Sequence, residues 1–177
     1  MSAIAAALLA LSAPAPATVT LAIERGPAVS LSQHMAPLAP LVGEWRGSGW
    51  MLMPDGTRRS FESRETVTSR LSGNALLVEG RHYAPGNPQR PVHDAMAMIT
   101  WDQRAGAYRF RSALANGSGG DFPLEVSPGR FAWRMEMQGA RIDYVAEFTG
   151  DTWTERGRRT GADGRSIDFF EMRLRRQ

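Results

Sequence analysis

The chain has 177 residues, enough for one domain with a sizeable hydrophobic core, and this length argues against a second domain. It contains no cysteine, which excludes disulfides, zinc–thiolate sites and thiol nucleophiles. All 21 basic residues are arginines, and against 18 acidic residues they leave a net charge of only +3, so we expect a mixed surface charge and no nucleic-acid partner.

Residues 1–17 have the pattern of a secretory signal peptide. An apolar run extends from Ala3 to Leu11, and a small-residue motif ends at Ala17. No Arg or Lys precedes this run, and the run is too short to span a bilayer as a transmembrane helix. We therefore expect cleavage after Ala17, no transmembrane segment, and a periplasmic or secreted protein; a disordered cytoplasmic tail is the alternative.

Residues 18–37 show no clear period and are predicted to form a linker or a short helix. Pro37 and Pro40 limit any helix in this part of the chain to a short one. From residue 38 onwards the pattern changes to short segments of alternating polarity, separated by Gly, Asn, Asp and Pro. This pattern predicts a single all-β domain over residues 38–177.

About ten strands are predicted in this domain. They span residues 44–53, 57–71, 75–84, 92–101, 107–114, 120–126, 129–137, 140–149, 152–160 and 166–175. A meander of this kind has two exposed edges unless it closes, so we expect an antiparallel up-and-down β-barrel; a pair of packed sheets is the alternative. Ten strands enclose more space than a few side chains fill, so a ligand-sized cavity is expected inside.

The turn at 138–139 predicts a register in which one face is apolar and the other is charged. It pairs Met137 with Ala140, Met135 with Ile142, Trp133 with Tyr144 and Phe131 with Ala146. The next turn, at 150–151, pairs Thr149 with Thr152 and places Trp153 opposite Phe148 and Glu155 opposite Ala146. Glu155 is therefore predicted to be an inward carboxylate.

A third turn, at 73–74, brings together the residues best suited to acid–base chemistry. A two-residue turn there sets Glu65 opposite His82, whereas a three-residue loop sets it against Arg81. With His93 from the adjacent strand, these residues could exchange protons with a substrate; a hydrogen-bonded structural pair or exposed side chains are the alternative. A shared face alone does not define a metal site, and no metal ligands are predicted.

Three short motifs resemble those of lipocalin-like barrels. They are Leu41–Gly49, with its Gly-x-Trp opening, the hairpin from Trp101 to Tyr108, and the closing strand Phe169–Leu174. Over about residues 38 to 177 the chain is similar to nitrobindin-like barrels and to uncharacterised bacterial lipocalin-like domains. The resemblance implies a barrel floor closed by Trp45 under an arginine from near the chain end, Arg173 or Arg175.

Nitrobindin-like proteins bind haem through a histidine close to the C-terminus. The chain has only His34, His82 and His93, and none of them lies in the last strands. The resemblance therefore implies the fold without a matching haem ligand, and we expect no cofactor.

The inner face of the predicted barrel supplies the candidate binding residues. Its aromatic and aliphatic members are Tyr108, Phe110, Phe131, Trp133, Met135, Ile142, Tyr144 and Phe148, and its acid–base members are Glu65, His82 and Glu155. Such a face suits a lipid-like or aromatic ligand, although the same side chains also pack well in a filled core.

These features favour an exported barrel that binds a small apolar or amphipathic molecule without transforming it. One alternative is a lipocalin-fold enzyme, such as a cyclase, isomerase or decarboxylase, that uses Glu65, His82, Tyr144 and Glu155. Buried carboxyl or histidine groups with perturbed pKa values at a cavity wall would favour this alternative. Another is an envelope interaction module, which would have a filled core and an exposed apolar patch.

Overall fold

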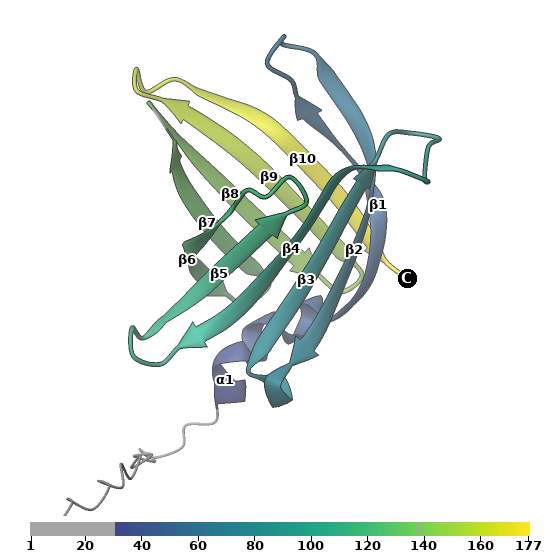
Figure 1. Cartoon of the computed structure of the whole chain (residues 1–177). Helices are drawn as coiled ribbons and strands as arrows, with labels where there is room; N and C mark the ends of the chain where they lie inside the picture. The colour runs from purple at the N-terminus through teal and green to yellow at the C-terminus, as the bar shows by residue number, and fades with distance from the viewer. Residues whose placement is uncertain (1–30, 138) are drawn as a thin grey trace, which may run out of the picture.

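The computed structural model describes residues 31–137 and 139–177. The expected signal peptide at 1–17, residues 18–30 of the expected linker and residue 138 of the turn at 138–139 lie outside the described residues. The described chain forms ten antiparallel strands, preceded by a short helical segment (Figure 1).

The ten strands close into one barrel in which each strand pairs with its sequence neighbours and β10 pairs with β1. The strands are β1 (Gly43–Leu52), β2 (Arg58–Arg70), β3 (Ala75–Tyr83), β4 (Pro91–Asp102), β5 (Ala107–Leu114), β6 (Gly119–Ser127), β7 (Arg130–Met137), β8 (Ala140–Thr149), β9 (Thr152–Gly161) and β10 (Ser166–Arg176). Each begins and ends within one residue of its predicted range. The predicted up-and-down barrel is confirmed, and the alternative of two packed sheets is wrong.

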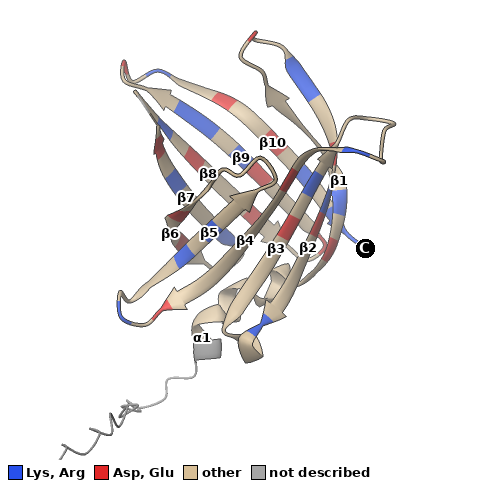
Figure 2. Ribbon diagram, viewed as in Figure 1, with Lys and Arg blue, Asp and Glu red and all other residues tan. Residues whose placement is uncertain are grey.

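Charged residues are distributed along the strands (Figure 2), and the ion pairs that join neighbouring strands are largely exposed. Arg134 pairs with Asp143 at 2.6 Å, and Arg158 pairs with Asp168 at 2.7 Å. Ion pairs of this kind at the surface typically contribute less than about 1 kcal/mol each to the free energy of unfolding, so they add little to the stability of the fold. The inner face carries the hydrophobic core.

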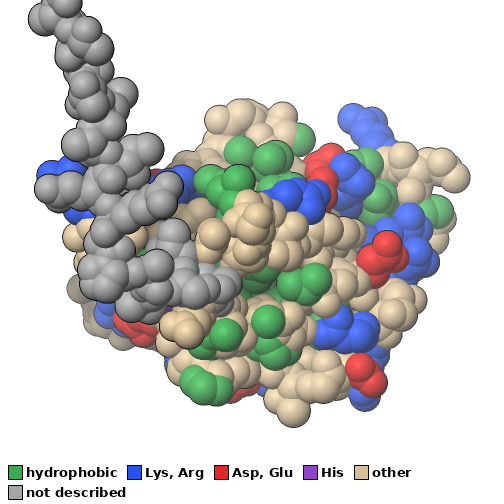
Figure 3. Space-filling model, turned by 90° about the horizontal axis from the view of Figure 1, so that it is seen from below, with side chains coloured by type: hydrophobic (Ala, Val, Ile, Leu, Met, Phe, Trp, Pro, Cys, Tyr) green, Lys and Arg blue, Asp and Glu red, His purple; other side chains and the backbone are tan. Residues whose placement is uncertain are grey.

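A short helical segment closes one end of the barrel (Figure 1). It consists of α1 (Leu31–Met35) and η1 (Ala36–Leu41), a 3-10 helix that contains the two prolines. Leu38 is fully buried, and the indole N–H of Trp45 donates to the Leu41 carbonyl at 2.8 Å. Figure 3 shows this end from below, with hydrophobic side chains between arginines and acidic residues. None of the helices in the described part of the chain is long and apolar enough to cross a membrane.

The arginine over the floor tryptophan is Arg176, and the expectation of Arg173 or Arg175 is wrong. The Arg176 guanidinium lies 4.2 Å from the centre of the Trp45 ring and donates to two backbone carbonyls at the end of η1. Side chains alternate along β10, so Arg173 and Arg175 point outward, whereas Arg176 shares the side of the buried Leu174.

The predicted register of β7, β8 and β9 is confirmed. Met137 pairs with Ala140, Trp133 with Tyr144, Thr149 with Thr152 and Ala146 with Glu155. The apolar partners in these pairs face the interior, as the alternation required. Glu155 is therefore carried to the inner side of the barrel.

The predicted register of β2 and β3 is wrong by two residues. Glu65 pairs with Gly80 across the ladder, rather than with His82 or Arg81. A shift of two residues leaves every side chain on the same face of the sheet, whereas a shift of one would reverse the faces. Glu65 and His82 therefore still point inward, on a diagonal instead of directly opposite each other.

The connection between β2 and β3 explains this difference. It has four residues and contains η2 (Leu71–Gly73), a single 3-10 turn. Leu71 and Ser72 adopt positive φ angles of 51° and 55°, which are uncommon for residues other than glycine. The Asn74 side chain donates to the Leu71 carbonyl at 2.9 Å and closes the turn.

Candidate functional site

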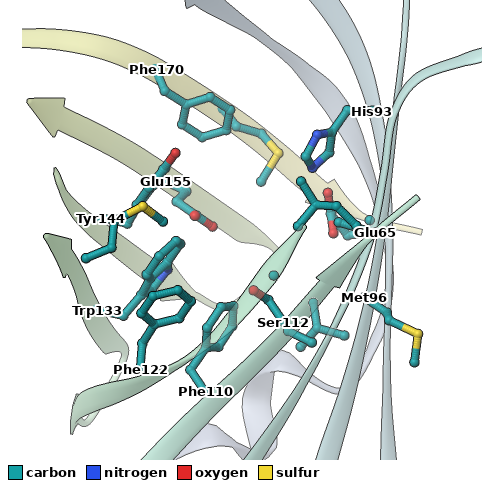
Figure 4. A pocket seen from close by; sticks show the side chains of 18 of the residues that line it. Glu65, His93, Met96, Phe110, Ser112, Phe122, Trp133, Tyr144, Glu155 and Phe170 are labelled. Carbon is teal, nitrogen blue, oxygen red and sulfur yellow. The ribbon is translucent and has the colours of Figure 1, made fainter. Parts of the chain in front are cut away.

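The barrel contains a cavity of about 560 Å³ that reaches towards the end opposite the helical segment. All ten strands contribute to its lining, and Figure 4 shows side chains of its wall. The inner part is formed by Glu65, Val78, Tyr144 and Glu155, and the outer part includes Met51, Ser118 and Met137 from the open end. The core on the floor side of the cavity is filled, so the cavity is closed at one end only.

Most of the predicted binding residues line this cavity. They are Glu65, His82, Phe110, Phe131, Trp133, Met135, Tyr144 and Glu155. Three others do not. Tyr108 lies near the floor, where its hydroxyl donates to the His34 carbonyl of α1; Phe148 packs against Phe131 in the core; and Ile142 is buried away from the cavity surface.

One wall of the cavity is an aromatic stack. The Trp133 ring lies between Phe110, at 5.0 Å between ring centres, and Tyr144, at 4.3 Å. Phe122 tilts against the same indole at 5.2 Å. Offset and stacked aromatic rings pack rigidly and present a broad apolar surface, so this wall suits the apolar body of a ligand.

Glu65 is the most deeply buried carboxyl group of the site, with 6% of its surface exposed. Ser63 donates a hydrogen bond to Glu65 Oε1 at 3.0 Å, and His82 Nε2 lies 3.4 Å from the same oxygen. Burial raises the pKa of Glu65 from 4.5 to about 8, because the ionised form loses its hydration, and the Ser63 hydrogen bond opposes the rise. The absence of a side chain at Gly80 makes room for Oε2, since a Cβ there would lie 2.4 Å from it.

His82 sits between two rings beside Glu65. It stacks on Phe61 at 4.2 Å between ring centres and on His93 at 4.8 Å. Burial lowers the pKa of His82 to about 4, and burial also lowers the pKa of His93, with a further contribution from His82. At neutral pH the imidazole of His82 is therefore uncharged.

Glu155 reaches the cavity from β9 and makes no ion pair among the described residues. Burial raises its pKa to about 8, and the nearby Glu65 carboxyl adds to the rise. The indole N–H of Trp153 lies close to this carboxyl group and lowers its pKa, which opposes the rise. Burial and Glu155 together raise the pKa of Tyr144 on the neighbouring strand.

Several lining residues were not predicted. The main ones are Phe122 on β6, Trp153 on β9, and Phe170 and Met172 on β10. The alternation of polarity within β6 and β10 could have predicted that Phe122, Phe170 and Met172 face inward. Each of them lies two residues from another inward apolar side chain. Trp153 was predicted to face inward, but nothing in the sequence showed that it would reach the cavity.

The residues present do not fit the haem arrangement that the nitrobindin resemblance implies. β10, the strand closest to the C-terminus, turns Phe170, Met172 and Leu174 inward, and none of its residues is a histidine. His82, which does face the cavity, is held between two rings and against Glu65. The strand on which the resemblance places the haem ligand therefore offers no histidine to haem iron.

The arrangement can donate hydrogen bonds and exchange protons. Near neutral pH Glu65 and Glu155 are largely neutral acids, and a raised carboxyl pKa is a property of many general acids. Among residues 31–137 and 139–177, no group of three or more His, Asp and Glu side chains is placed to hold a metal ion.

Comparison with known proteins supports the fold and gives one distant sequence match. No protein-family model matches the chain. Over 70 residues the chain is 34% identical to a peroxynitrite isomerase of Nocardia farcinica, a match that covers 40% of this chain and 40% of that protein. The match thus spans less than half the length of this curated relative.

Solved structures with similar folds are lipocalin-like barrels. Rv2717c from M. tuberculosis superposes with a TM-score of 0.61 at 15% identity, covering 81% of this chain and 96% of that one. The S-type phycobiliprotein lyase CPES from Guillardia theta gives 0.53 at 10% identity, covering 83% and 92%. A DUF3598-family protein of unknown function from Nostoc punctiforme gives 0.52 at 12% identity, covering 79% of this chain and 48% of that one. At these identities the likeness shows the fold alone, and the chain has a lipocalin-like barrel fold.

Proposed function

We propose that the barrel binds a small, largely apolar or amphipathic molecule in its interior. The observation that carries this proposal is the cavity of about 560 Å³, with an aromatic wall and a few polar groups at its inner end. Ligand sites in proteins typically have volumes of about 300–1,000 Å³ and this same composition. A filled core, as in an envelope interaction module, would leave no such space.

Ligand retention and rebinding test the proposal. We expect native mass spectrometry of protein purified without detergent, or of delipidated protein mixed with a panel of hydrophobic compounds, to show a one-to-one complex. Ser112→Phe fills the cavity and should abolish this complex, whereas Ala113→Phe, the adjacent residue facing outward, should leave it intact. Equal binding by the two variants, or no complex with any compound, would refute binding inside the barrel.

A second candidate function is acid–base catalysis on the bound molecule. It is favoured by Glu65 and Glu155, whose carboxyl groups have pKa values raised to about 8 and face one cavity. One group in its acid form could protonate a substrate while the other, ionised, removes a proton. The Nocardia relative is a peroxynitrite isomerase, and the Guillardia barrel is a phycobiliprotein lyase, so related folds are compatible with catalysis.

Isomerisation of a simple β,γ-unsaturated ketone tests this second candidate. Migration of the double bond requires removal of one proton and delivery of another, and the conjugated product is followed by its ultraviolet absorbance. We expect acceleration over buffer that is lost in Glu155→Gln and retained in Glu147→Gln, which changes an outer carboxylate on β8. A rate equal to that in buffer alone would refute the hypothesis that the protein catalyses proton transfer of this class.

We also propose that the protein is exported, as the apolar run and small-residue motif of residues 1–17 predict. Cell fractionation should recover the protein outside the cytoplasm. Its intact mass should correspond to a chain that begins at Thr18. A cytoplasmic protein that retains residues 1–17 would contradict the proposal.

A further inference from the structure

The carboxyl groups at the inner end of the cavity have no arginine or lysine partner among the described residues. The chain contains no lysine, and no arginine is among the described residues that line the cavity. Arg176, at the floor of the barrel, instead donates to the backbone carbonyls of Pro40 and Val42. No arginine therefore lines the cavity among the described residues, and its largely apolar wall carries the carboxyl groups of Glu65, Glu136 and Glu155.

Glu65 has one oxygen free to contact a ligand. Its Oε1 atom accepts the Ser63 hydrogen bond and faces His82, but Oε2 has no hydrogen-bond or ion-pair partner in the described chain, although only 6% of the residue is exposed. Buried carboxyl groups are normally paired, because an unpaired buried charge is strongly unfavourable. An unpaired oxygen directed at a cavity thus indicates that the partner comes from outside the chain.

Glu155 approaches the same space from the other side of the barrel. Figure 4 shows both carboxyl groups pointing into the cavity, with the aromatic wall of Trp133, Phe122 and Phe110 next to Glu155. The two acids are close enough for Glu65 to disfavour the ionisation of Glu155. A positive charge placed between them would interact favourably with both.

We infer that the ligand of this cavity is an organic cation: a small molecule with an ammonium group that is held by Glu65 and Glu155 and an apolar body that packs on the aromatic wall. The inference rests on the proposed binding function and narrows it to one class of ligand. A bound ammonium group can donate to Glu65 Oε2 and to Glu155, so it supplies the hydrogen bonds that the protein itself leaves unmade.

The composition of the cavity disfavours the other ligand classes. An anionic ligand such as a fatty acid would place its carboxylate near two acids with no arginine to pair it. A divalent metal ion generally needs more ligands than two carboxyl groups, and the described residues hold no such cluster. A neutral ligand could hydrogen-bond to the two carboxyl groups but would not compensate their charge once they ionise.

The other titratable groups around the two acids carry no positive charge at neutral pH. β3 contributes His82, β4 contributes His93, and burial lowers the pKa of both. β7 contributes the acidic Glu136 and β8 contributes Tyr144, whose pKa is raised, while β1 and β10 present Met51, Phe170 and Met172. The pH dependence of cation binding should therefore follow the ionisation of the two carboxyl groups.

Three matched probes test the inference: phenylbutylamine as the cation, phenylbutanol as the neutral analogue and phenylbutyrate as the anion. Isothermal titration calorimetry of the full chain at about pH 8 should show the amine binding about tenfold or more tightly than the alcohol, with the anion weakest. A primary amine stays protonated well above this pH. From about pH 6 to about pH 8 the amine affinity should rise by up to tenfold per pH unit, while the alcohol affinity stays constant.

Substitutions then test which residues cause the preference for a cationic ligand. Glu155→Gln should reduce the ratio of amine to alcohol affinity by about tenfold, with the alcohol affinity retained. Glu65→Gln should have a similar effect, and Glu147→Gln on the outer face should have none. Thermal unfolding confirms that each variant is folded, and the wild-type ratio tests the inference even if one variant is not.

Each outcome decides between the inference and the function on which it rests. An alcohol that binds as tightly as the amine, or an affinity ratio unchanged in both inner variants, would overturn the organic-cation inference while binding inside the barrel still stands. Failure of all three probes to bind would overturn the inference and count against the proposed function as well.

Discussion

Replacing Glu65 by glutamine should change how the stability of the protein depends on pH. The substitution keeps the size of the side chain and an oxygen that accepts the Ser63 hydrogen bond, but it removes the ionisable group. In the folded protein the carboxyl pKa is raised from 4.5 to about 8, so the folded state holds a proton that the unfolded chain has already released. The stability that this group contributes is present below about pH 4.5 and is lost as the pH rises towards about 8.

The magnitude follows from the size of the pKa change. Each pKa unit corresponds to about 1.4 kcal/mol, so a rise from 4.5 to about 8 amounts to on the order of 5 kcal/mol between the two ends of the range. The free energy of unfolding of the wild type, relative to Glu65→Gln, should therefore fall by up to about 1.4 kcal/mol per pH unit between about pH 5 and pH 8 and then level off. Glu65→Gln should be the more stable protein at the alkaline end.

Urea unfolding followed by tryptophan fluorescence across this pH range measures the effect. Glu147→Gln is the matched control, because Glu147 is an exposed carboxylate on β8 that pairs only with a surface arginine. Its stability profile should run parallel to that of the wild type. The reasoning is refuted if the Glu65→Gln profile also runs parallel to the wild type, because the carboxyl group would then have the same pKa in the folded and unfolded chains.

Three further predictions concern the floor and the wall of the cavity. Arg176→Met should lower the free energy of unfolding in urea by about 1–3 kcal/mol, and Arg173→Met by less than about 0.5 kcal/mol; equal losses would argue against the floor contact. Gly80→Ala should destabilise by about 1–3 kcal/mol, because its methyl group would meet Glu65, and additivity with Glu65→Ala in a double-mutant cycle would contradict this cause. His82 should remain neutral in an NMR titration down to about pH 5, and because its pKa falls from 6.5 to about 4 on folding, stability should be lost as the pH drops below about 6.5; titration near pH 6.5 would exclude its burial.

The fold could be predicted because the alternation of polarity and the positions of the turns agreed along most of the chain. Alternation placed ten strands within one residue of their observed bounds, and the tight turns at 138–139 and 150–151 fixed the register of three of them. Barrel closure followed from the free edges that an open meander would leave. Each of these inferences depends only on local sequence and general geometry.

The register of β2 and β3 could not be predicted, because it depends on a turn with unusual backbone angles. Gly73 and Asn74 have the composition of a two-residue turn, but Leu71 and Ser72 take positive φ angles and lengthen the connection to four residues. Propensities disfavour this conformation for leucine, and the hydrogen bonds of Asn74 stabilise it. The faces were still predicted correctly, because the error was an even number of residues.

The acid–base residues of the site were predicted better than its lining. Glu65, His82, Tyr144 and Glu155 all face the cavity, because the alternation of their strands was determined. The sequence did not predict how far along the barrel axis each residue lies. Alternation predicts only which face of the sheet a side chain is on. Tyr108 and Phe148 share the inward face but lie near the floor, where the filled core leaves no cavity beside them.

The inner carboxyl groups lower the stability of the barrel at neutral pH, and this argues that they serve a function. Glutamine would have filled the same space at Glu65 and Glu155 without an ionisable group, so packing alone gives no reason for two glutamates. The aromatic wall does not require them either, because its rings pack against one another. Groups that reduce stability at a cavity wall, and that the fold does not pair, are the features expected of a site whose partner is a ligand.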